Sequence, residues 1–153
     1  TEEEAVDIKT ADKRFDIGLL ASRVMSALRW ADAEPSVAKL SVGLFGASTG
    51  AAAALWAAAQ EPRRVDAVVS RGGRPDLAGP WLSQVQAPTL LIVGELDTEV
   101  IRLNQQAAER MTCECRMVIV PGATHLFQET GTLDRAADLA ASWFRDHLSA
   151  TSS

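Results

Sequence analysis

Three side chains of this sequence, Ser48, Asp97 and His125, have the chemistry of a nucleophile with its proton relay. A serine hydroxyl attacks poorly unless a nearby base takes its proton, and a third group must orient that base. The chain carries only two histidines, and the other, His147, is expected on the surface of the last helix. The residue types therefore predict a serine nucleophile, with His125 as its base and Asp97 as the orienting acid.

The serine lies in Gly46-Ala47-Ser48-Thr49-Gly50, which matches the pattern G-x-S-x-G. An apolar stretch precedes this turn and an alanine-rich stretch follows it, so a strand, a tight turn and a helix are expected. Both glycines are expected to remove Cβ atoms that would clash in the turn. The alternative is a glycine-rich turn whose serine only caps the helix.

The two partners of the serine each have a competing interpretation. Asp97 precedes a helix that is expected to begin near Thr98, and aspartate is a common helix cap. Glu95 is the second choice for the acid. A histidine in a loop such as that of His125 is often no more than a polar turn residue.

The rest of the chain supplies the elements that must position these side chains. Apolar runs predict strands at residues 40–45, 65–70, 88–93 and 116–120. Helices are expected from residue 16 to just before Pro35, from the serine turn to just before Pro62, and at 80–85, 98–111 and 132–148. The inward faces of three of these helices are predicted to hold Leu20, Val24, Ala27, Leu28 and Ala31; Val100, Leu103, Ala107 and Met111; and Leu133, Ala137, Ala140, Phe144 and Leu148.

Strands that alternate with helices indicate an α/β fold, a parallel sheet of about four strands flanked by helices. In such a sheet the loops after the strands meet at one edge. Ser48, Asp97 and His125 each follow a predicted strand, so they are expected at that edge. The backbone N–H of Thr49 is the expected oxyanion donor. Arg71 and Arg74 are candidates for gripping a substrate carboxylate or phosphate, or for a solvated loop. Trp81 and Phe127 are weaker candidates for lining a pocket.

Length and composition predict a single domain over residues 1–153, opened by a polar segment at 1–15. The net charge of −5 argues against nucleic acid as a partner, and no apolar run is long enough to span a membrane. Cys113 and Cys115 lack the spacing of a zinc site and are interpreted as thiols of a reducing cytoplasm, with a redox pair as the alternative. A small-molecule substrate is expected, with no cofactor and no metal.

The strings GASTG, VGELD and PGATHLF together resemble the α/β-hydrolase fold, and within it the dienelactone hydrolase family. SRGGRPDLAG is similar to a hydrolase-like domain associated with some bacterial phosphoribosyltransferases. The resemblance implies a Ser48–Asp97–His125 triad that hydrolyses an ester, a lactone or a thioester. The dienelactone enzymes themselves use a cysteine nucleophile, where this chain has Ser48.

The resemblance covers only the second half of the family's domain, and the sequence does not begin with Met. We therefore expect the C-terminal portion of a larger hydrolase domain, without the second oxyanion donor. The strand at 40–45 would then lie at an edge of the sheet, covered by residues 1–14, by a second copy or by a missing N-terminal half. The alternative to an enzyme is a catalytically silent module that binds or stabilises a partner domain.

Overall fold

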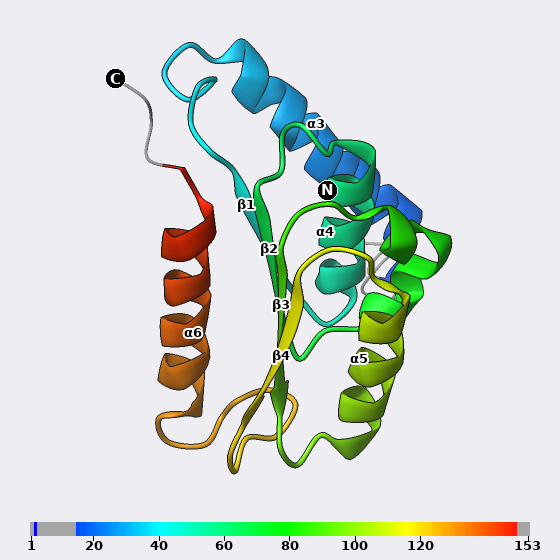
Figure 1. Ribbon diagram of the computed structural model, residues 1–153, viewed down its shortest axis with the longest axis vertical. Helices are drawn as coiled ribbons and strands as arrows, with labels where there is room; N and C mark the ends of the chain where they lie inside the picture. The colour runs from blue at the N-terminus through cyan, green and yellow to red at the C-terminus, as the bar shows by residue number, and fades with distance from the viewer. Residues whose placement is uncertain (1, 3–14, 150–153) are drawn as a thin grey trace.

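The structure is a computed structural model that describes residue 2 and residues 15–149. Four strands alternate with helices along the chain (Figure 1). In chain order the elements are α3 (Ile17–Ala33), β1 (Gly43–Ala47), α4 (Thr49–Gln60), β2 (Ala67–Arg71), η1 (Pro75–Gln84), β3 (Thr89–Gly94), α5 (Thr98–Arg110), β4 (Cys115–Val120) and α6 (Thr132–His147). None of the helices in these described residues combines the length and the apolarity that a membrane span requires.

The four strands form one parallel sheet in the order β1-β2-β3-β4. Helix α6 covers one face of the sheet, while α4 and α5 lie on the other (Figure 1). Helix α3 packs on α4, in a further layer. The predicted α/β class, a parallel sheet of four strands flanked by helices, is therefore confirmed.

Each face of the sheet has its own apolar core. Val68 of β2 points to the face of α4, together with Leu55 and Leu82. The neighbouring Val69 points to the face of α6, where it packs with Trp143. Because β2 and β3 are covered on both faces, their side chains form almost continuous apolar runs, which is why the sequence revealed these strands clearly.

The inward face predicted for α6 is partly wrong. Leu133 is 53% exposed, whereas the buried apolar positions are Ala136, Ala140 and Trp143. Ala137, also predicted to be inside, is exposed. Successive helical residues differ by about 100° in direction, so choosing the neighbouring residue rotates the expected face out of the core.

Two other burial predictions fail for similar local reasons. Ala27 of α3 is exposed, because the stripe of α3 that is buried holds Ala21 and Leu28 instead. His147, expected on the surface, is only partly exposed: its imidazole lies 4.0 Å from the Trp143 ring, centroid to centroid, and its side chain is 17% exposed.

Strand β1 is an edge of the sheet and, within the described part of the chain, pairs only with β2. Phe45, part of the apolar run from which this strand was predicted, is 52% exposed. Its side chain shares a face with Gly43, beside α6, and α6 packs mainly on β2, β3 and β4. The predicted cover from residues 1–14 lies outside the described residues, apart from residue 2.

Candidate active site

Ser48 occupies a strained turn between β1 and α4. Its backbone has φ of 51° and ψ of −125°, a region that residues other than glycine rarely adopt. Its side chain makes no capping hydrogen bond to α4, although Ser48 stands at the cap position. Strain of this kind persists only where the surrounding structure enforces it, and it is concentrated at functional sites.

The two glycines of the motif play different parts, contrary to the prediction that both prevent clashes. A Cβ on Gly46 would lie 2.4 Å from the carbonyl oxygen of Gly50 and 2.6 Å from Cα of Ala51. A Cβ on Gly50 would have no atom of the described structure within 4 Å. Only Gly46 is therefore required to be small by the turn that presents Ser48.

Asp97 and His125 form a direct contact at the carboxyl edge of the sheet. The distance from His125 Nδ1 to Asp97 Oδ2 is 2.6 Å. Asp97 stands at the cap position of α5, but its side chain makes no capping hydrogen bond. The Asp97 carboxylate therefore contacts His125 instead of capping the helix. If the proton of the neutral imidazole is on Nδ1, facing Asp97, the other ring nitrogen, Nε2, keeps a lone pair that can accept a proton.

Glu95, the second choice for the acid, has a different partner. Its carboxylate accepts a hydrogen bond of 2.8 Å from the backbone N–H of Gly122. The backbone N–H of Leu96 bonds the carbonyl of Ala123 at 3.0 Å. The loop after β3 thus holds the first part of the loop that carries His125.

The loop that carries His125 is also braced from within. The Glu129 carboxylate accepts bonds from the backbone N–H and the hydroxyl of Thr124, and these bonds lower the pKa of Glu129. Phe127 has a positive φ of 55° and is only 2% exposed, in the core beneath α6. Phe127 is therefore a core residue, and its burial gives no support to the pocket-lining role expected for it.

The two candidate arginines both have partners within the chain. The Arg74 guanidinium binds the Asp76 carboxylate through two hydrogen bonds, of 2.9 and 2.8 Å, which raise the pKa of Arg74. Arg71 donates one bond of 3.4 Å to the carbonyl of Leu126 and lies 5.3 Å from the centre of the Phe127 ring. A further candidate, Trp81, stacks on Trp56 and so packs η1 against α4.

Ser48, Asp97 and His125 follow β1, β3 and β4, so all three lie at the carboxyl edge of the sheet. Within the described residues, no hydrogen bond joins the Ser48 hydroxyl to His125. Catalytic hydrogen bonds are often long or poorly aligned before substrate binds and tighten in the complex. The backbone carbonyl of Ser48 accepts a 3.0 Å hydrogen bond from the N–H of Arg74, in the loop after β2.

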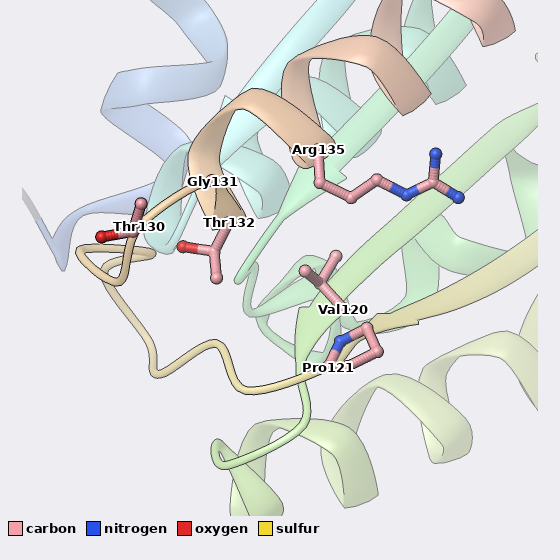
Figure 2. Close-up of a pocket in the computed structure, with 6 residues that line it drawn as sticks. All are labelled: Val120, Pro121, Thr130, Gly131, Thr132 and Arg135. Carbon is pink, nitrogen blue, oxygen red and sulfur yellow. The ribbon is translucent and has the colours of Figure 1, made fainter.

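A pocket of about 320 Å³ lies beside the end of β4 and the start of α6 (Figure 2). It is lined by Val120, Pro121, Thr130, Gly131, Thr132 and Arg135. None of Ser48, Asp97 and His125 is among these residues, so the candidate active site is a separate feature of the same edge.

The described residues contain no group of three histidine, cysteine or acidic side chains that could hold a metal ion. Cys113 and Cys115 are free thiols, and burial raises the pKa of both, that of Cys115 to about 11. A thiol with so high a pKa is almost entirely protonated near neutral pH and is therefore a poor redox centre.

Comparison with known proteins gives consistent relatives. The sequence profile of the dienelactone hydrolase family matches residues 2–149. A dienelactone hydrolase from Anabaena variabilis is 54% identical, with a TM-score of 0.95 over 97% of this chain and 69% of that protein. A dienelactone hydrolase-like promiscuous phosphotriesterase from metagenomic libraries, at 19% identity and a TM-score of 0.72 over 91% of this chain and 66% of that chain, shares the fold.

Two proteins of Mycobacterium tuberculosis, provisionally named as phosphoribosyl transferases, are also close relatives. Each is 58% identical over 134 residues, which make up 88% of this chain. The chain spans 30% of the length of these curated relatives. The chain belongs to the dienelactone hydrolase family, and its fold is that of an α/β hydrolase, as the sequence motifs predicted.

Proposed function

We propose that this protein is a serine hydrolase that cleaves an ester, a lactone or a thioester through an acyl-enzyme at Ser48. The observation that carries the proposal is the 2.6 Å contact between His125 Nδ1 and Asp97 Oδ2. It pairs a base with an orienting carboxylate at the edge of the sheet where the strained turn presents Ser48. The hydrolase family to which the chain belongs supports the same reaction class.

In the proposed reaction, Ser48 Oγ attacks the carbonyl carbon of the substrate while His125 Nε2 takes the hydroxyl proton. The Asp97 carboxylate stabilises the imidazolium that forms and keeps its ring oriented. The imidazolium then gives its proton to the leaving group, and an ester of Ser48 remains. Water, activated by the same imidazole, hydrolyses that ester and restores the serine.

The oxyanion of each tetrahedral intermediate needs a hydrogen-bond donor. We assign one donor, the backbone N–H of Thr49, the first residue of α4. The N-terminal end of a helix carries partial positive charge and favours an anion. One such donor contributes on the order of 10²–10³ in rate in serine hydrolases.

Arg71 is the proposed contact for an anionic group of the substrate. Its guanidinium uses one of its N–H groups for a long bond to Leu126. Arg74 already donates two hydrogen bonds, from Nε and Nη2, to the Asp76 carboxylate. It is therefore the weaker of the two candidates for binding a substrate anion. The substrate class that this favours is an ester or lactone bearing a carboxylate or a phosphate.

The long relatives favour a second candidate function. In the Mycobacterium tuberculosis proteins the matched region is only 30% of the chain, so there it accompanies a large amount of other sequence. A hydrolase-like module without catalytic activity, which binds or stabilises a partner domain, would also fit that arrangement.

A fluorophosphonate probe separates the two functions, because it forms a covalent adduct with an activated serine. We expect one adduct by intact mass, mapped to the peptide that contains Ser48. Ser48→Ala should abolish it, while Ser83→Ala, which removes an exposed serine on η1, should leave it unchanged. A folded protein that forms no adduct at Ser48 would refute the hydrolase and favour the silent module.

A further inference from the structure

Gly72 follows β2 and lies next to the proposed base. Its backbone N–H donates a 2.7 Å hydrogen bond to the carbonyl of Ile92, which continues the pairing of β2 with β3 by one residue. Its φ is +52°, in the left-handed region that favours glycine. The position of this backbone is therefore fixed by the sheet, while its conformation selects against a side chain.

The space around Gly72 is taken up by the loop that carries His125. A Cβ built on Gly72 would lie 3.1 Å from the carbonyl oxygen of His125 and 3.6 Å from His125 Nδ1. Nδ1 is the atom that contacts Asp97. The third neighbour is the ring of Phe127, also at 3.6 Å. The backbone and the imidazole of His125 thus border the space that a side chain at position 72 would fill.

The residues that follow connect this contact to the nucleophile. A Cβ on Gly73 would lie 2.0 Å from Ser70 Oγ and 2.5 Å from Cβ of Ala51, in the first turn of α4. The next N–H, that of Arg74, donates to the carbonyl of Ser48 at 3.0 Å. A continuous run of three residues therefore lies beside the His125 loop at one end and is hydrogen-bonded to the nucleophile turn at the other.

We propose that Gly72 is a positioning residue that sets the distance and orientation of His125 relative to Ser48. Because Gly72 has no side chain, the loop that carries His125 can pack against the end of β2. Residues 72–74 then hold that loop at a fixed distance from the Ser48 turn. The inference rests on the proposed function, because positioning matters only if His125 acts on Ser48.

Gly79 offers a matched control for the substitution Gly72→Ala. Gly79 has φ of +55°, within a few degrees of the φ of Gly72, but a Cβ there would meet no neighbouring atom of the described structure within 4 Å. Gly72→Ala adds backbone strain and a contact with His125, whereas Gly79→Ala adds strain alone. The difference between the two variants isolates the contact.

The experiment measures the rate of fluorophosphonate modification of Ser48 and the downfield proton resonance of His125 Nδ1–H. A displacement of about 1 Å in a catalytic group can reduce a rate by on the order of 10²-fold. We expect Gly72→Ala to slow modification towards that extent and to shift the resonance. Gly79→Ala should keep both at their wild-type values.

Equal rates and equal resonances in the two variants would overturn the inference. If the wild-type protein were not modified at Ser48, the proposed function would fail, and the resonance would still show whether Gly72 sets the geometry of His125. If Gly72→Ala did not fold, nuclear Overhauser contacts between the Gly72 α-protons and the His125 ring in the wild type would decide. Their absence would also contradict the inference.

Discussion

The substitution Gly46→Ala tests how the nucleophile turn is built. The added methyl group would lie 2.4 Å from the carbonyl oxygen of Gly50 and 2.6 Å from both N and Cα of Ala51. These are backbone atoms of the first turn of α4, so no side chain can rotate away to make room. The clash must be relieved by moving the helix away from β1, and the Ser48 turn moves with it.

The size of the effect follows from the number and kind of close contacts. Inserting one methyl group into a packed site costs about 1–3 kcal/mol, and the absence of a flexible neighbour places Gly46→Ala at the upper end. For a domain of this size each kcal/mol lowers the melting temperature by roughly 2–4 °C. At about 3 kcal/mol we therefore expect a decrease of roughly 6–12 °C. Gly50→Ala should be neutral or stabilising by up to about 1 kcal/mol, since alanine favours the helix and meets no neighbour there.

The assay is thermal unfolding followed by circular dichroism, with both variants measured beside the wild type. Fluorophosphonate modification of Ser48 gives a second readout, which Gly46→Ala should slow and Gly50→Ala should leave closer to the wild-type rate. A Gly46→Ala protein as stable as the wild type would refute the packing argument for this turn. A Gly50→Ala protein as unstable as Gly46→Ala would refute it equally.

Three further substitutions test other parts of the structure. Asp97→Asn should slow modification of Ser48 by about 10⁴-fold, because an amide favours the wrong imidazole tautomer, whereas Glu95→Gln should have little effect. Asn104→Leu removes two buried hydrogen bonds and leaves a buried carbonyl unpaired, so urea unfolding should show a loss of about 1–3 kcal/mol; an unchanged midpoint would contradict this. The pKa of Cys115 is raised from 9.0 to about 11 by burial, so the folded state keeps its proton after the unfolded chain has lost it. Stability should therefore fall as pH rises through that interval, and Cys115→Ala should fall less steeply.

The local part of the site could be predicted from the sequence. The apolar run, the glycine and the alanine-rich stretch around Ser48 specify a strand, a turn and a helix within a few residues of one another. The order of the strands along the chain then brings Asp97 and His125 to the same edge, because parallel strands end together. These predictions do not depend on which helix packs on which face of the sheet.

The parts that failed depend on distant neighbours. Leu133 and Ala136 are both apolar positions of α6, and only the packed sheet determines that the alanine is the buried one. Asn104 resembles a surface residue in the sequence, yet it is fully buried, since its amide bonds the carbonyl of Gly73. The preference for Asp97 over Glu95 as the acid did not fail, but the contact of Asp97 with His125 that bears on it is a distance the sequence does not contain.

The contribution of Gly72 illustrates the same limit at the site itself. In the sequence, Gly72 is one glycine of a loop with several breakers, and such a glycine is typical of an ordinary turn. The role proposed for Gly72 rests on the loop after β4, which is distant in sequence and places the His125 carbonyl 3.1 Å from where a Cβ would lie. No local pattern could have distinguished Gly72 from Gly79.

The most direct test of the central claim is the rate at which a fluorophosphonate modifies Ser48 in His125→Gln and in His147→Gln. The second histidine stacks on Trp143 and bonds Glu114, away from the carboxyl edge of the sheet, so its replacement controls for the loss of an imidazole. If His125 is the base, His125→Gln should lose nearly all modification while His147→Gln keeps the wild-type rate. Equal rates in the two variants, with both folded, would contradict the assignment of His125 as the base for Ser48.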